Sequence, residues 1–430
     1  MTTQPTDGQR PLVGASPHPV IRLAVLALLG ICLCALLSVH IAAPWQFIHD
    51  DNGAWFSSTA RTHILRGLME TRGQDFFLVR GTEEMRPYLH HPPFISLYLA
   101  AVFAGTGLDT PLVARTAIAV LHVLSFLVFL RIAKVILGND LLPRLWSAFI
   151  FAIVPMSVFF GKMPNHEVPG LLFFQLGVLV SLSGVTRNKY SRGNLVVLFL
   201  AWLLVPIASW HAALSGLVFV LCFCFVVRRH NRKAFLLTSC SALVGSLLIV
   251  IVHLLWANQW QVLTSQHTSF FYWLTVPEGE NRIAFWAQSL AHAAKHSRRF
   301  YADIPWLLSI AWMIWLGVLT IKRRRPRSTE LTVLFMGAGS ILYCTVFAPA
   351  VSSHAYQQFY LLPFIALSSA LGLSELYGRV ALRRKALAVL LVVLLSLATL
   401  RSASRRLYRL YREPGAYAVA ASRAIETQFY

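Results

Sequence analysis

Long apolar segments constrain this chain more than any other feature of its sequence. Runs such as 21–43 and 234–257 reach the roughly 20 residues that a helix needs to cross the hydrocarbon core of a membrane. The strands of a membrane-spanning barrel would instead be short segments with alternating apolar and polar residues. Hydrophobic residues make up 57% of the chain and charged residues 13%, outside the range of water-soluble domains. The sequence therefore predicts an all-α integral membrane protein.

Eleven apolar segments are candidate membrane-spanning helices. They cover residues 20–43, 111–133, 143–161, 167–185, 194–210, 212–228, 234–257, 304–321, 331–350, 358–377 and 386–400. A further apolar segment, 93–106, has about 14 residues and is too short to cross. We therefore expect it to be a re-entrant helix or a helix parallel to the membrane surface.

Basic clusters between the apolar segments set the expected orientation. If 93–106 does not cross, five clusters fall on one side of the membrane. They lie within 131–144, 187–192, 228–233, 322–327 and 379–385. Loops rich in Lys and Arg stay in the cytoplasm, so 44–110 and 258–303 are expected to be long outward loops of a multi-pass plasma-membrane protein. Topology thus accounts for the net charge of +21, and nucleic acid is not an expected partner.

The remaining segments flank a membrane domain that covers 20–400. Residues 1–19 are rich in Pro, Thr, Gly and Gln and are expected to be a disordered cytoplasmic N-terminus. In the tail 401–430, the arginines Arg401, Arg405, Arg406, Arg409 and Arg412 would lie outside if 386–400 crosses, which the charge rule disfavours, so the side of the tail is left open. The six cysteines all lie in apolar segments, without the spacing of a disulfide framework or a metal site.

Two adjacent carboxylates, Asp50 and Asp51, follow the first apolar segment directly. Like charge and partial burial at the membrane boundary raise the pKa of a carboxyl group, so one of the two could act as a general base. The alternative is that Asp50 simply caps the helix that begins after it. That helix, 56–70, carries apolar residues at every fourth position, which is typical of a helix lying on a membrane surface.

Further polar side chains are expected at the same outward end of the domain. They are Arg86, Tyr88, His90 and His91 in the first loop, Lys162, His166 and Glu167 after the third span, Trp210 and His211 after the fifth, and His354 and Tyr356 after the ninth. Polar groups at membrane depth are costly and commonly mark a substrate path. Each histidine alone could be an ordinary interfacial residue, but their gathering at one end favours a shared site.

The order of these motifs resembles the GT-C superfamily of membrane glycosyltransferases, particularly glycosyltransferase family 39 with the protein O-mannosyltransferases, and the aminoarabinose lipid A transferases. Asp50 and Asp51 occupy the place of an acidic pair after the first span. His90-His91-Pro92-Pro93-Phe94 matches the motif that opens a membrane-parallel helix. Glu167 matches a later outward acidic residue, and the segment from His354 to Tyr356 precedes a span containing Pro363. Two departures are Asp51 in place of Glu and His91 in place of the common Lys.

This resemblance implies a GT-C-like bundle of about 11 transmembrane helices, with membrane-parallel helices in the first outward loop. It also implies transfer of a sugar from a polyprenyl-phosphate donor to a lipid, polysaccharide or protein acceptor at the outer face, with inversion. Asp50, Asp51 and Glu167 would be the catalytic residues. Substrate would be bound by Arg86, His90, His91, Lys162, His166, His354 and Tyr356. No cofactor or metal is expected, although an oxygen-rich metal site at the three carboxylates is the alternative found in oligosaccharyltransferases of the same superfamily.

Two other classes of protein stay open at this point. A membrane transporter would place ionisable groups near the bilayer midplane and show internal repeats, neither of which is evident here. A polymerase or ligase of surface polysaccharide would use the same kind of donor, but the early acidic pair argues against it. A purely structural or assembly role is the remaining alternative.

Overall fold

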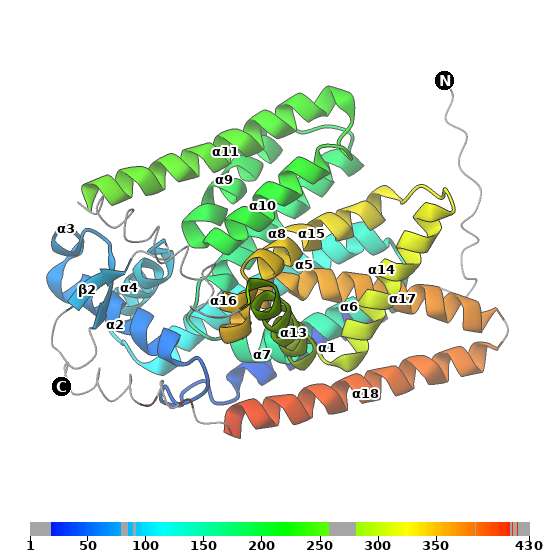
Figure 1. The fold of residues 1–430 in the computed structure, drawn as a ribbon, viewed down its shortest axis with the longest axis horizontal. Coiled ribbons are helices and arrows are strands. Elements are labelled where there is room, and N and C mark those ends of the chain that lie inside the picture. Colours follow the sequence, from blue (N-terminus) through cyan, green and yellow to red (C-terminus); the bar gives the residue numbers. More distant parts are fainter. Residues whose placement is uncertain are drawn as a thin grey trace.

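The structure is a computed structural model that describes residues 19–78, 85–88, 92–257, 281–382 and 384–412, together with Gly415 and Val419. Its helices form an elongated bundle, with α2, α3, α4 and a small sheet gathered at one end (Figure 1). The expected loop 258–303 is described only from residue 281, and the expected N-terminal segment 1–19 only from residue 19.

The first part of the chain supplies one long helix and the elements of the first loop. They are α1 (Pro19–Ser38), α2 (Asp51–Arg66), α3 (Leu68–Thr71), β1 (Asp75–Leu78), β2 (Met85–Tyr88) and α4 (Phe94–Thr106). The middle of the chain is helical. It contains α5 (Pro111–Leu137), α6 (Leu141–Ile153), α7 (Pro155–Phe160), α8 (Glu167–Thr186), α9 (Arg192–Ala208), α10 (Trp210–Phe223) and α11 (Arg229–Trp256).

The last part of the chain completes the bundle. It contains α13 (Arg282–Tyr301), α14 (Asp303–Ile321), α15 (Ser328–Val346), α16 (Ala348–Ser353), the 3₁₀ helix η1 (Ala355–Leu361), α17 (Leu362–Ala381) and α18 (Lys385–Arg412). Within the described residues, seven helical segments are long and apolar enough to cross a membrane. They are α5, α8, α11, α14, α15, η1 with α17, and α18. The other four of the eleven expected spans coincide with shorter apolar helices, α1, α6, α9 and α10. The expectation of a multi-pass helical protein is therefore confirmed, and seven of its eleven expected spans are long and apolar enough to cross a membrane.

One element departs from the all-α expectation. Strands β1 and β2 form a two-stranded antiparallel sheet in the first loop, in which Asp75 pairs with Tyr88 and Leu78 with Met85. Each strand has only four residues, too few to produce a readable alternation of apolar and polar positions. The first loop is therefore mixed, with two strands set between helices.

Prolines break two of the expected spans near the end of the bundle that carries the first loop. Segment 143–161 is divided into α6 and α7 at Val154, whose extended backbone precedes Pro155 at the first position of α7. Segment 331–350 ends in α15, and Pro349 opens the short helix α16. Each break turns the chain just before a polar segment, so the breaks place Lys162 and His354 at the bundle end.

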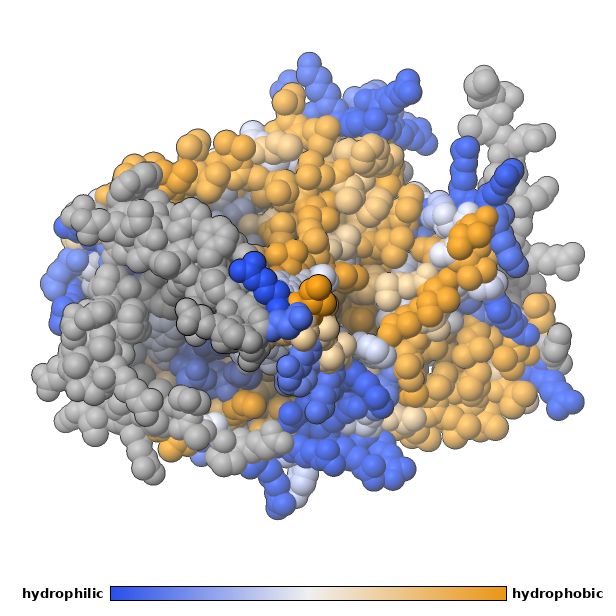
Figure 2. Space-filling view, in the orientation of Figure 1, coloured by the Kyte–Doolittle hydropathy of each residue, from blue (hydrophilic) through white to orange (hydrophobic). Residues whose placement is uncertain are grey.

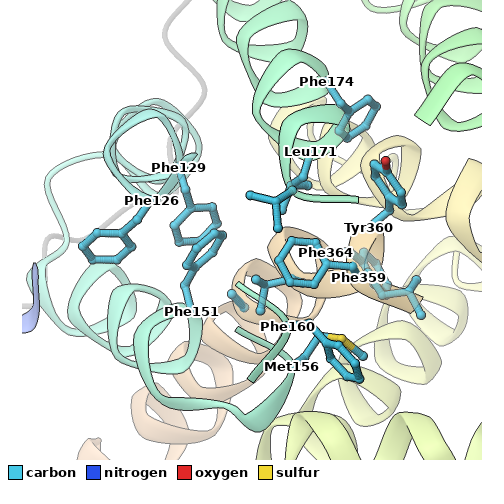
Figure 3. Close-up of a cluster of buried hydrophobic side chains, with 14 of the residues drawn as sticks. Phe126, Phe129, Phe151, Met156, Phe160, Leu171, Phe174, Phe359, Tyr360 and Phe364 are labelled. Carbon is cyan, nitrogen blue, oxygen red and sulfur yellow. The ribbon is translucent and has the colours of Figure 1, made fainter. Parts of the chain in front are cut away.

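Aromatic side chains fill the centre of the bundle. The rings of Phe129 on α5 and Phe151 on α6 stack with centroids 4.5 Å apart, and Phe364 from α17 lies nearby (Figure 3). Outside this core, large apolar side chains on α11 and α18 remain exposed, including Leu248 and Leu394. Figure 2 shows the resulting hydrophobic faces, which suit contact with lipid chains.

Helix α18 continues well beyond the expected span 386–400, because it runs unbroken to Arg412. The ring of Tyr411 in its last turn lies 5.3 Å from the ring of Phe47 in the first loop. Arg406 forms an ion pair of 2.7 Å with Asp303 at the start of α14. The basic end of α18 therefore lies at the same end of the bundle as Asp50 and Asp51. The sequence left the side of the tail open, and the structure places its described part at this end.

Candidate active site

The first loop makes a compact turn between α1 and α2, and this turn fixes the acidic pair. His49 adopts φ of 64°, a left-handed conformation that is uncommon for a residue with a side chain. The turn directs the His49 ring toward Tyr356 and His354, with ring centroids 5.3 and 6.3 Å away. Asp50 and Asp51 follow at the start of α2.

Asp50 is almost completely buried and heavily bonded. Its Oδ2 atom accepts hydrogen bonds from the backbone N–H groups of Gln46, at 3.1 Å, and Phe47, at 2.9 Å. The guanidinium of Arg115 on α5 donates to the same oxygen at 2.9 Å. The Asp50 side chain makes no capping hydrogen bond to α2, so the alternative that it caps this helix does not hold. Burial raises the pKa of Asp50, while Arg115 and the two N–H donors oppose that rise.

Arg115 ties the whole turn together. Besides Asp50, it donates hydrogen bonds to the carbonyls of Ile41, Ala43 and Pro44, and its guanidinium lies 4.3 Å from the centre of the Trp45 ring. A buried guanidinium whose donors are used in this way is a structural clamp. The Asp50 carboxylate is consequently part of the support of the turn.

Asp51 has a different environment. It is half-buried at the first position of α2 and interacts electrostatically with His354, which lies between α16 and η1. Burial raises the pKa of Asp51, while the backbone N–H groups that begin α2 and the neighbouring His354 oppose the rise. A carboxylate with a raised pKa and no guanidinium clamp is better suited to accept a proton.

His354, the neighbour of Asp51, belongs to a group of aromatic and imidazole rings that includes His49 and Tyr356. The ring of His354 lies 5.5 Å from that of Tyr356, and its Nδ1 atom is 3.2 Å from the carbonyl oxygen of Ala350. Burial lowers the pKa of His49 to about 4, and the nearby His354 and His296 add to this effect. Burial also lowers the pKa of His354. These rings are therefore neutral near pH 7 and can donate or accept hydrogen bonds without carrying positive charge.

Lys162 lies beside the Asp50 clamp. It is 4% exposed, donates a hydrogen bond to the carbonyl of Val39 and sits 4.9 Å from the centre of the Tyr411 ring. Burial lowers the pKa of Lys162 to about 7, Arg115 contributes in the same direction and Asp50 opposes. The lysine is thus a buried amine that changes charge near neutral pH.

Glu167 and His166 lie where α8 begins. The His166 ring makes an edge contact with Phe56 on α2, at 4.7 Å between centroids, which joins this turn to the first loop. Glu167 is 4% exposed, and its Oε2 atom has no hydrogen-bond partner among the described residues. A buried carboxylate oxygen without a partner is costly, so Glu167 stays a candidate for the site.

A second polar cluster adjoins Glu167. The ring of His211 on α10 stacks on Tyr343 at 3.7 Å and lies 4.4 Å from Tyr360, and Glu167 interacts electrostatically with both tyrosines. From the sequence, His211 is only one of several outward polar residues. Its link to Glu167 depends on the packing of α8, α10, α15 and η1, and no sequence motif indicates it.

The structure leaves several predicted site residues untested. Arg86 is placed by its backbone, which pairs with Phe77 in the β-sheet. His90 and His91 lie outside the described residues. The structure brings together Asp51, His49, His354 and Tyr356. Among the described residues, no group of three or more His, Cys, Asp or Glu side chains is arranged to hold a metal ion.

The arrangement of helices is similar to that in solved structures of an archaeal oligosaccharyltransferase and of ArnT. No protein-family model and no curated protein sequence matches the chain. The apo oligosaccharyltransferase of Archaeoglobus fulgidus matches with a TM-score of 0.62 and 12% identity, over 92% of this chain and 56% of that chain. The oligosaccharyltransferase AglB from the same archaeon, in complex with an inhibitory peptide and a dolichol-phosphate, matches with a TM-score of 0.60 and 13% identity, over 94% of this chain and 56% of that chain.

ArnT from Cupriavidus metallidurans is a second kind of match. Its structure bound to undecaprenyl phosphate gives a TM-score of 0.54 and 14% identity, over 96% of this chain and 76% of that chain. The chain thus spans little more than half of the oligosaccharyltransferase and about three quarters of ArnT. At these identities the likeness concerns the fold, and it confirms the expected GT-C resemblance.

Proposed function

We propose that this protein transfers a sugar from a polyprenyl-phosphate donor to an acceptor at the end of the bundle that carries the first loop. The observation that carries the proposal is the difference between the two members of the acidic pair. Asp50 is hydrogen-bonded to Arg115, whereas Asp51 interacts with His354. A fold shared with enzymes solved with dolichol-phosphate and undecaprenyl phosphate supports the choice of donor. We propose that this end is extracytoplasmic, following the charge of the loops.

Asp51 is the general base in this proposal. Its carboxylate takes the proton of the acceptor hydroxyl as the hydroxyl oxygen forms a bond to the anomeric carbon. The bond from that carbon to the donor phosphate breaks at the same time, and its electron pair leaves with the polyprenyl phosphate. Attack opposite the leaving group inverts the anomeric centre. General base catalysis of this kind typically contributes between about 100-fold and 10,000-fold in rate.

The other residues support this step. His354 lies next to Asp51, and Tyr356 lies against the ring of His354. We propose that both orient the acceptor through hydrogen bonds. On the α8 side, Glu167 remains a proposed catalytic residue and His166 a proposed substrate contact. Arg86, His90 and His91 remain proposed ligands of the donor phosphate. Lys162, also predicted to bind that phosphate, is buried against Val39 and Tyr411. We propose that it stabilises the phosphate from beneath the turn between α1 and α2.

The test uses membranes that contain the full chain and a radiolabelled polyprenyl-phosphate sugar. Wild type should release sugar from the lipid, and Asp51→Asn should reduce that rate at least 100-fold. Asp140→Asn is the matched control, because Asp140 lies outside the acidic pair, just before α6. If Asp51→Asn and wild type release sugar equally with every donor tried, the proposed role of Asp51 is wrong.

A further inference from the structure

Charge is strongly segregated in the part of the chain that contains α9, α10 and α11. Residues 168–277 contain no Asp or Glu. The same stretch contains seven cations, all in the connections before α9 and α11 or in the first turns of these two helices. They are Arg187, Lys189, Arg192, Arg228, Arg229, Arg232 and Lys233. Such a concentration of like charge repels itself and attracts anions.

The two connections that carry these cations are held together as one platform. The buried ring of Tyr190 packs on Phe235 of α11, 6.1 Å between centroids, and its hydroxyl donates to the carbonyl of Ser181 at 2.9 Å. His230 lies 3.3 Å from the carbonyl oxygen of Asn188. No ion pair joins any of the seven cations to a carboxylate within the described residues. The backbone that carries these cations is therefore held in place, and no described carboxylate acts as their counterion.

An apolar groove of about 450 Å³ runs between α9 and α11 next to this platform. Its walls include Leu195, Phe199 and Leu200 from α9 and Leu237, Thr238 and Ser241 from α11. None of these residues belongs to the candidate active site. Figure 2 shows hydrophilic side chains along the upper edge of the view, above the hydrophobic face to which α9 and α11 contribute.

Helical spacing places one cation from each helix at the end of the groove, on the same helix face as the residues that line it. Arg192 precedes Leu195 by three residues, and Lys233 precedes Leu237 by four. Residues three or four apart lie on the same face of a helix, and helical side chains lean toward the N-terminus. The two cations therefore stand one turn beyond the groove, and the positive ends of both helix dipoles lie at the same level.

We propose that this groove binds one acyl chain of an anionic phospholipid, whose phosphate is held by Arg192 and Lys233. The groove supplies apolar surface for the chain, and the platform supplies the countercharge for the headgroup. Basic pockets between membrane helices bind anionic headgroups in this manner. A zwitterionic lipid would fill the groove and leave the platform uncompensated. Because the residues lie outside the candidate active site, the proposal is independent of the proposed transfer reaction.

The experiment measures the thermal unfolding of the purified full chain in detergent. Phosphatidylglycerol should raise the unfolding temperature in a saturable manner, and phosphatidylcholine should have little effect. The double variant Arg192→Gln/Lys233→Gln should weaken the apparent affinity for phosphatidylglycerol by roughly tenfold or more. Leu200→Trp, which fills the groove and keeps both cations, should have an effect of the same kind.

The matched control is Lys322→Gln/Arg325→Gln, which removes two exposed cations from another basic connection. It should bind phosphatidylglycerol like wild type. Equal stabilisation by phosphatidylcholine, or unchanged affinity in both groove variants, would overturn the proposal. An equal loss of affinity in the control would show general charge attraction in place of a site. Displacement of phosphatidylglycerol by substoichiometric undecaprenyl phosphate would assign the groove to the carrier lipid and overturn the choice of phospholipid.

Discussion

The two neighbouring carboxylates of the first loop lie in opposite kinds of surroundings. Asp50 faces back into the turn, where Arg115 and two backbone N–H groups bind one of its oxygens. Asp51 faces the segment between α16 and η1, where His354 is its neighbour. Two residues that are adjacent in a sequence can thus have different roles, one in supporting a site and the other in its chemistry. The division depends on which distant residue each side chain meets.

The largest expected effect is on the Asp50 side. Arg115→Met should lower the free energy of unfolding by about 3–5 kcal/mol, because it leaves the buried Asp50 carboxylate without its partner. Chemical unfolding of the purified protein measures this value. The double variant Asp50→Asn/Arg115→Met should lose much less than the sum of the two single variants. Additive losses would mean that the two groups are not coupled.

The next expected effect concerns the packing beneath the turn. A methyl group at Gly53 would collide with the Trp45 ring, which lies against the Arg115 guanidinium. Gly53→Ala should therefore cost about 1–3 kcal/mol of stability through overpacking. Gly105→Ala is the matched control, because a methyl group there meets no neighbouring atom. Equal unfolding midpoints for the two variants would contradict the close packing at Trp45.

The third expected effect is a pH dependence of the free energy of unfolding that arises from Lys162. The Lys162 pKa is about 7 in the folded chain, against an ordinary value of 10.5, so the unfolded chain holds a proton that the folded chain lacks between these pH values. Stability should then rise with pH across this window by at most about 1.4 kcal/mol per pH unit. Lys162→Met should remove that rise, as unfolding at pH 7 and pH 9 would show. If the free energy of unfolding of Lys162→Met rose between pH 7 and pH 9 as steeply as that of wild type, Lys162 would not be the cause of the rise.

The smallest effect is expected at the Asp51 side. His354 opposes the rise in the Asp51 pKa, so His354→Gln should raise that pKa further. The loss of activity on acidification should move to higher pH by less than one unit, since only the ionised Asp51 accepts a proton. A pH profile of sugar release measures the shift, with unfolding midpoints as the check on folding. Movement of this limb to lower pH would contradict the assigned pairing.

Much of the fold was predictable from the sequence because hydrophobic length is a local property. All eleven expected spans coincide with helices, and Pro155 explains why one of them is divided. The β-sheet was not predictable, because its four-residue strands are too short for a periodic signal. Within the part of the chain that the structure describes, the all-α expectation therefore fails only in the first loop.

The candidate site was predictable in its location but not in its roles. Asp50 and Asp51 look equivalent in the sequence, and the residue that separates them, Arg115, lies inside an apolar span 65 residues away. Similarly, the neighbourhood of Glu167 and His211 arises from helices far apart in the chain. Long-range packing of this kind leaves no periodic signal in a single sequence.

The position of the last helix has a consequence for how the protein is made. A basic cluster precedes helix α18, and the helix itself carries a series of arginines up to Arg412, so if α18 crosses the bilayer, one of these two groups has to be moved across it during insertion. The arginine series is synthesised late, when Asp303, which accepts Arg406, has already left the ribosome. We therefore expect the insertion of α18 against the usual charge preference to depend on the helices made before it, because Arg406 pairs with Asp303 at the start of α14.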